Sequence, residues 1–196
     1  MGEGKIYMEL IEKIQADLKE ILSERRYTHS VGVMKMAGEL AEIYGVDIEN
    51  AKLAGLLHDN AKEMSEEEML KYVEENNIEI NEFEKHNVKI LHGKIGADIA
   101  KKKYGISEKI QKAIEYHTTT NPNMDILAKI VYISDKIELT RKSDSYDIEQ
   151  EREIAKQDLD EAVLLIINNT TKHLIDNDKL IAVESIETRN KIMLEH

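Results

Sequence analysis

Apolar residues recur at helical spacing along most of the chain, and this pattern constrains the fold more than any other feature. Within residues 6–22, six aliphatic side chains share one helical stripe: Leu10, Ile11, Ile14, Leu18, Ile21 and Leu22. The 196 residues include one proline and nine glycines, so few positions can interrupt a helix. The pattern therefore predicts an all-α fold.

Capping residues divide this pattern into separate helices. Gly45 follows a helical stretch over residues 27–44, where a C-terminal glycine is expected. Asp47 can cap a third helix that runs into His58, and Ser65 opens a capping box. Further helices are predicted over residues 65–75, 92–104, 107–117, from 125 past 135, one long helix from 147 through 165, and 180–193.

No internal repeat and no long linker divides the chain, so we predict a single-domain helical bundle over residues 1–193. Helices over about 148–193 would form its C-terminal part. Residues 194–196, with the sequence Leu-Glu-His, are interpreted as the remnant of an expression tag.

The chain is strongly acidic, with a formal net charge of −12 from 27 basic and 39 acidic side chains. Such a surface repels nucleic acids and anionic membranes, so neither is expected as a partner. The absence of cysteine excludes disulfides and thiolate metal sites and fits a cytoplasmic location. No apolar run approaches the roughly 20 residues that a membrane-spanning helix needs.

Six side chains stand in contexts that suggest metal ligands: His29, His58, Asp59, His92, His117 and Asp135. A single histidine near a helix end is more often a cap or a partly buried polar group, so each residue alone carries little weight. Asp135 lies within an apolar run, and a buried carboxylate without a cation would be unfavourable. His86 and His173 are interpreted as structural or surface residues.

The adjacent pair His58-Asp59 sets a geometric condition. Neighbouring side chains on an α-helix project roughly 100° apart, so both can reach one ion only near a helix end. The residues that follow, 60–62, are therefore predicted to leave the helix. A ligand set of nitrogen and oxygen atoms suits iron, manganese, cobalt or zinc better than magnesium.

Five strings in order resemble the HD-domain phosphohydrolase superfamily and, more narrowly, the bacterial YqeK family of symmetrical bis(5′-nucleosyl)-tetraphosphatases. These strings are RYTHSVGV, LAGLLHDNAKE, LHGKIGADIA, AIEYHTTTNPNM and IVYISDKIELTRK. The resemblance spans about residues 26–141, which would form the metal-binding core. Relatives commonly have a glycine in the loop after the His117-Thr118 position, where this chain has Thr119, Thr120 and Asn121.

The resemblance implies two divalent transition-metal ions, with iron favoured and manganese, cobalt or zinc as alternatives. One ion would be held by His29, His58, Asp59 and Asp135. The second would be held by His92 and His117, with Asp59 bridging the two. A hydroxide between the ions would attack an inner phosphorus of diadenosine tetraphosphate, giving two ADP.

Asp59 and Lys62 are the predicted catalytic residues, and Asp59 is interpreted as a metal bridge more than a free general base. Phosphate contacts are predicted from five residues: Arg26, Lys62, Thr118, Lys136 and Arg141. The expected partner is a nucleotide, and a homodimer is compatible with the sequence. Two other hypotheses stay open: another HD-domain nucleotide phosphohydrolase or phosphodiesterase, and a non-catalytic sensor that binds nucleotide or metal.

Overall fold

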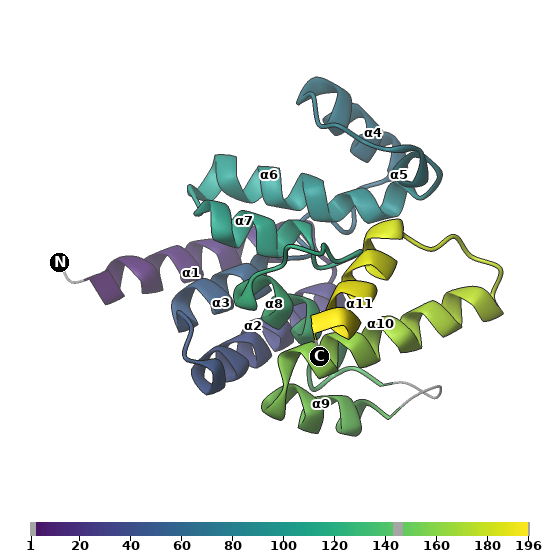
Figure 1. Ribbon diagram of the computed structural model, residues 1–196. Coiled ribbons are helices and arrows are strands. Elements are labelled where there is room, and N and C mark those ends of the chain that lie inside the picture. Colours follow the sequence, from purple (N-terminus) through teal and green to yellow (C-terminus); the bar gives the residue numbers. More distant parts are fainter. Residues whose placement is uncertain (1–2, 143–146, 196) are drawn as a thin grey trace.

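The computed structural model describes residues 3–142 and 147–195 and confirms the all-α fold (Figure 1). Residues 1, 2 and 196, which belong to the predicted domain and tag, lie outside the described residues. The helices within the described ranges are α1 Glu3–Ile21, α2 Glu24–Tyr44, α3 Ile48–Leu57, α4 Glu66–Glu75, α5 Glu82–His86, the 3-10 helix η1 Val88–Leu91, α6 His92–Tyr104, α7 Glu108–Glu115, α8 Ile126–Ile137, α9 Ile148–Gln157, α10 Leu159–Asp176 and α11 Val183–Glu195.

Local capping chemistry sets most helix boundaries where the sequence predicts them. The Asp47 side chain accepts a hydrogen bond from the backbone N–H of Asn50 at the start of α3. Ser65 forms a reciprocal capping box with Glu68 at the start of α4. Gly45 adopts φ 65° after α2, a left-handed conformation that glycine reaches without steric strain.

The predicted long helix after residue 147 is wrong, because it divides into α9 and α10 at Asp158. The backbone of Asp158 is extended, with φ −149° and ψ 114°. Its carboxylate accepts hydrogen bonds from the backbone N–H groups of Asp160 and Glu161, so an aspartate in the middle of the apolar pattern acts as an N-cap. The last helix also begins at Val183, three residues later than predicted.

Two short elements between α4 and α6, α5 and η1, are absent from the prediction. Asn81 caps α5 through a reciprocal box with Glu84, the same device that begins α4. With five and four residues, these elements are too short to show helical periodicity.

The core forms where α2, α3 and α8 pack together, with α6 and α7 on one side and α9 to α11 on the other (Figure 1). The helices α2 and α3 approach closely at Gly55, where a Cβ atom would lie 3.0 Å from the carbonyl oxygen of Val33. This packing places the start of α2, the end of α3 and the C-terminal half of α8 around one buried point.

Within the described residues, no helix combines the length and apolar character that crossing a membrane requires.

Candidate metal centre

The six predicted ligand side chains meet at the centre of the bundle, and all of them are buried: His29, His58, Asp59, His92, His117 and Asp135. Their ligand atoms form three overlapping groups, each with all atoms within 4.8 Å of one another. These groups are His29–His58–Asp59, His58–His117–Asp135 and Asp59–His92–His117. His58 is the C-cap of α3, so the pair His58-Asp59 does stand at a helix end.

Three of the histidines are oriented in the same way by the backbone three residues earlier. The Nδ1 atom of His58 lies 2.7 Å from the carbonyl oxygen of Gly55. The corresponding distances are 2.5 Å from His92 to Lys89 and 2.6 Å from His117 to Ile114. A carbonyl can only accept, so Nδ1 carries the proton in each ring. The Nε2 atom of each ring therefore faces the centre, where the neutral form offers a lone pair.

The inward-facing nitrogen atoms need a cation. The Nε2 atoms of His92 and His117 lie 3.1 Å apart, and two lone pairs at that distance repel unless a proton or a metal ion lies near them. The Nε2 atom of His58 is buried without a hydrogen-bond partner among the described residues. A divalent metal ion satisfies both conditions, since neutral imidazole is a good ligand for it.

The two carboxylate oxygens of Asp59 face different histidines. Oδ1 lies 3.2 Å from Nε2 of His92 and 3.5 Å from Nε2 of His117. Oδ2 lies 3.3 Å from Nε2 of His58 and 3.8 Å from Nε2 of His29. Asp59 therefore stands between two histidine pairs and can contribute one oxygen to each.

The ionisation of the cluster follows from burial and from its two carboxylates. Burial lowers the pKa of His117 to about 4 and also lowers the pKa of His92, which keeps these rings neutral. For His58 burial acts in the same direction, but Asp59 and Asp135 outweigh it and raise the pKa to about 9. Burial alone would raise the pKa of Asp59, yet the surrounding histidines hold it well below its usual range.

Three of the predicted phosphate-binding cations pair with the carboxylates of this cluster. Nη1 of Arg26 donates to Oδ2 of Asp59 over 2.7 Å. Nζ of Lys136 lies 2.5 Å from Oδ2 of Asp135, and Nη2 of Arg141 lies 2.7 Å from Oδ1 of the same residue. These cations converge on the centre, in contrast to the solvated positions that most lysines and arginines of such an acidic chain take.

Of the remaining two predicted contacts, Lys62 lies at the centre and Thr118 lines a neighbouring cavity. Nζ of Lys62 is 3.2 Å from Nε2 of His92, and burial lowers the pKa of this lysine. Thr118 lines a cavity of about 190 Å³ together with Lys136. A larger cavity of about 580 Å³ shares no lining residue with it and is bordered by Arg26, His29 and Arg141.

Glu138 is a member of this site that the sequence reasoning missed. It is fully buried, and its Oε1 atom lies 3.0 Å from Nδ1 of His29. The backbone N–H and the hydroxyl of Thr140 also donate to this carboxylate, over 2.7 and 2.6 Å. Glu138 therefore orients His29 as the backbone carbonyls orient the other histidines. Its position three residues after Asp135, at the end of the same helix, was the available signal.

Replacing Glu138 with glutamine is expected to lower the metal affinity of the protein by about 10- to 100-fold, because a partner that fixes a histidine ligand contributes that much. Metal titration of the chelator-treated variant measures the effect. Glu153→Gln, an exposed change on α9, is the matched control. An affinity equal to that of the wild type would show that Glu138 does not support the centre.

The loop after His117 contains a residue in an unusual conformation. Thr120 has φ 61°, a left-handed backbone that a β-branched side chain adopts only under strain. Its buried hydroxyl donates to Thr188 of α11 over 3.1 Å, which ties the loop to the C-terminal helix.

A comparison of the sequence with models of protein families gives a match that covers the whole cluster. The model of the HD domain family matches residues 26–140, a span that contains all six side chains of the cluster. The chain belongs to the HD domain family. This membership implies that the cluster binds divalent metal, which agrees with its buried nitrogen and oxygen donors.

Individual HD relatives are similar over nearly their whole length. The symmetrical bis(5′-nucleosyl)-tetraphosphatase of Bacillus subtilis is 34% identical, with 91% of this chain and 95% of the relative aligned. The protein of the same name from Halalkalibacterium halodurans is 35% identical over 91% and 94% of the two chains. These relatives place the chain among the hydrolases of the family.

A solved structure confirms the HD fold. The crystal structure of a predicted HD superfamily hydrolase involved in NAD metabolism, from Clostridium acetobutylicum, is 39% identical in sequence. It superimposes with a TM-score of 0.91, covering 95% of this chain and 98% of the other.

Proposed function

We propose that this HD protein hydrolyses dinucleoside tetraphosphates symmetrically, converting diadenosine tetraphosphate into two ADP. The observation that carries the proposal is the position of Asp59, with one carboxylate oxygen toward His92 and His117 and the other toward His58 and His29. The name shared by the two bacterial relatives supports the choice of substrate.

The proposal assigns two divalent transition-metal ions to the cluster. His29, His58, Asp59 and Asp135 would hold one ion, and His92 and His117 would hold the other, with Asp59 shared. Iron is the favoured metal, and manganese, cobalt and zinc suit the same donors. When bound, such ions polarise phosphoryl oxygens and lower the pKa of water, which supplies the chemistry of anhydride hydrolysis.

The protein's own contribution is to hold the tetraphosphate and to balance its charge. Arg26, Lys136 and Arg141 pair with the ligand carboxylates, within reach of phosphate oxygens bound at the same point. Lys62, beside His92, is placed to interact with a phosphoryl oxygen or with the leaving group. The guanidinium groups can bind phosphate in a bidentate manner, whereas the lysines act as point charges.

Product analysis tests the proposed function. Metal-loaded protein incubated with diadenosine tetraphosphate is expected to release ADP as the sole nucleotide product, resolved by ion-exchange chromatography. A mixture of AMP and ATP would show asymmetric cleavage and contradict the proposal, as would the absence of turnover. Bis(p-nitrophenyl) phosphate serves as a control for unspecific phosphodiesterase activity, and we expect it to be a poor substrate.

A further inference from the structure

The cavity of about 190 Å³ beside the centre differs in character from the larger one. Most of its lining is apolar, with side chains from α5, η1, α10 and the segment before α11: Phe83, Ile90, Ile167, Leu174, Leu180 and Ile181. The larger cavity is lined instead by polar and charged groups, including Arg25, Arg26, Arg141 and Lys142. The metal centre thus has an apolar neighbour and a cationic neighbour.

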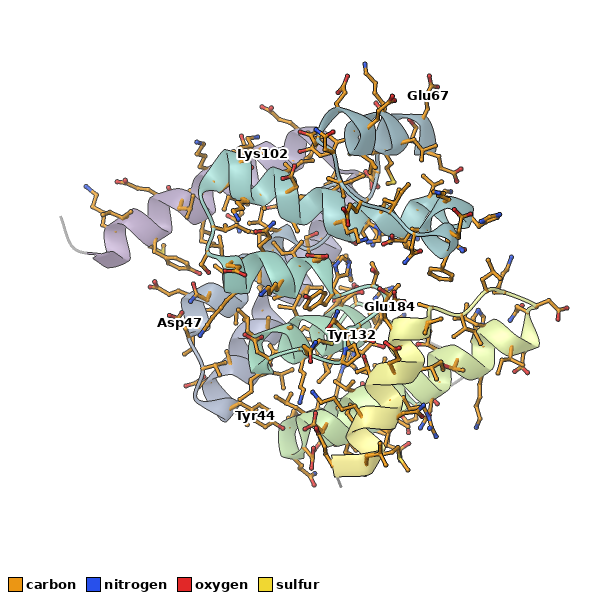
Figure 2. The ribbon with its side chains drawn as sticks, turned by 45° about the horizontal axis from the view of Figure 1, so that its top comes forward. Tyr44, Asp47, Glu67, Lys102, Tyr132 and Glu184 are labelled. Carbon is orange, nitrogen blue, oxygen red and sulfur yellow. The ribbon has the colours of Figure 1, made fainter. Side chains whose placement is uncertain are left out.

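The apolar cavity adjoins the metal centre through Lys136, which lines the cavity and pairs with Asp135. Thr118 and Lys136 line it, and they follow the ligands His117 and Asp135 in the sequence. Nζ of Lys136 lies 5.5 Å from the ring centroid of Tyr132, another lining residue, and 2.5 Å from Oδ2 of Asp135. Tyr132 of α8 and Ser185 in the first turn of α11 both line the cavity; Figure 2 labels Tyr132 and Glu184, the residue before Ser185.

The position of Phe83 is set by the anchoring of α5. The neighbouring Glu84 is buried and lies 2.7 Å from Nζ of Lys94 on α6, while it also caps its own helix through Asn81. These contacts hold one face of the short helix against α6. Phe83, the only phenylalanine of the chain, is left half-buried at the cavity wall.

The cavity wall exposes apolar surface that a ligand would cover. Leu180 lines the cavity and is 57% exposed, so its side chain is accessible to a bound ligand. The volume is below the range of drug-sized sites, so it suits one planar ring system. The hydroxyl groups of Thr170 and Thr171 and the side chain of Asn87 add polar atoms to the wall.

We infer that the Phe83 cavity binds one nucleobase of the substrate by stacking and apolar contact, while the phosphate chain extends past Lys136 to the metal centre. This inference rests on the proposed function for the identity of the ligand. It makes the two halves of a symmetrical substrate inequivalent on the enzyme, because the cationic cavity, in its described lining, has no Phe, Tyr or Trp side chain.

Calorimetry with metal-loaded protein can compare the binding of ADP with that of inorganic pyrophosphate. The comparison separates the contribution of the base to the affinity from that of the phosphates. Stacking on an aromatic side chain contributes enough that Phe83→Ala should weaken ADP binding by about 5- to 100-fold. Pyrophosphate binding should change by less than about twofold, since it lacks the base. Leu174→Ala should weaken ADP binding too, and Phe83→Tyr, which keeps the ring, should preserve it.

Ile175→Ala is the matched control, because Ile175 lies next to Leu174 on α10 but is 59% exposed and does not line the cavity. An ADP affinity unchanged in Phe83→Ala would overturn the inference, and so would equal weakening of ADP and pyrophosphate binding. These measurements need no turnover. If diadenosine tetraphosphate is not hydrolysed but the ADP effect is found, the proposed reaction fails and the base site stands.

Discussion

Replacing Asp59 with asparagine is expected to lower the rate of diadenosine tetraphosphate hydrolysis by about a thousandfold or more. The amide retains the size of the carboxylate but offers only one oxygen, so it cannot bind an ion on each side. It also removes the negative charge that pairs with Arg26 over 2.7 Å. Loss of metal-ion catalysis costs several kcal/mol of transition-state stabilisation, and about 1.4 kcal/mol corresponds to a tenfold change in rate.

The measurement is the initial rate at saturating metal, together with the metal content of the variant after gel filtration. Asp176→Asn, at an exposed position at the end of α10, controls for the chemical change alone. An Asp59→Asn protein that keeps its metal and more than about a tenth of the wild-type rate would refute the bridging role.

Removing the metal with a chelator is expected to abolish turnover while leaving the protein folded. Asp59 and Asp135 are paired with Arg26, Lys136 and Arg141, so their charges remain compensated when no ion is bound. The stability should nevertheless fall. An ion present at 100 times its dissociation constant stabilises the folded state by about 2.7 kcal/mol, or about 5–10 °C in Tm for a chain of this size.

Thermal unfolding of chelated and reloaded protein checks this expectation, with circular dichroism to confirm that helix content is retained. Return of both Tm and activity on adding Fe²⁺ or Mn²⁺ would agree with a metal that is bound at the active centre. A chelated protein with full activity would contradict it. A chelated protein that unfolds completely would show that the ion pairs do not compensate the carboxylates.

Much of the fold was predictable because helix boundaries are local. Asp47, Ser65 and Asp125 cap helices through their own backbone neighbours, so a short stretch of sequence is enough to place them. The break at Asp158 follows the same chemistry, but there the capping aspartate competes with a continuous apolar pattern. The sequence alone does not tell which of the two prevails, because the break depends on a tertiary contact. The packing of α10 on α8 sets the direction of the chain after Asp158.

The residues of the candidate site also fall into two groups, those that could be predicted from the sequence and those that could not. The histidines and aspartates stand in strings whose order and spacing resemble a known family, and the structure does bring them together. Glu138 lies inside the last of these strings, but neither its role nor that of Phe83 follows from the string alone. Glu138 acts through a contact with His29 that is 109 residues away in the sequence. Phe83 lies on a five-residue helix whose orientation depends on a tertiary ion pair between Glu84 and Lys94.

Basic side chains around the centre locally offset the negative net charge of the chain, which would otherwise repel an anionic substrate. A net charge of −12 opposes the approach of a polyphosphate at long range. Close to the centre the balance reverses, because Arg25, Arg26, Arg141 and Lys142 border one cavity and Lys136 borders the other. The approach of substrate should therefore speed up with added salt, whereas the contacts made once it is bound should weaken.

The most direct test of the two-metal centre is to count metal ions in active protein purified without chelators and without air. Elemental analysis of the same preparation that converts diadenosine tetraphosphate to ADP should give two transition-metal ions per chain, falling to one in a His92→Ala, His117→Ala double variant. Full activity with one ion or none per wild-type chain would contradict a centre in which Asp59 joins two metals.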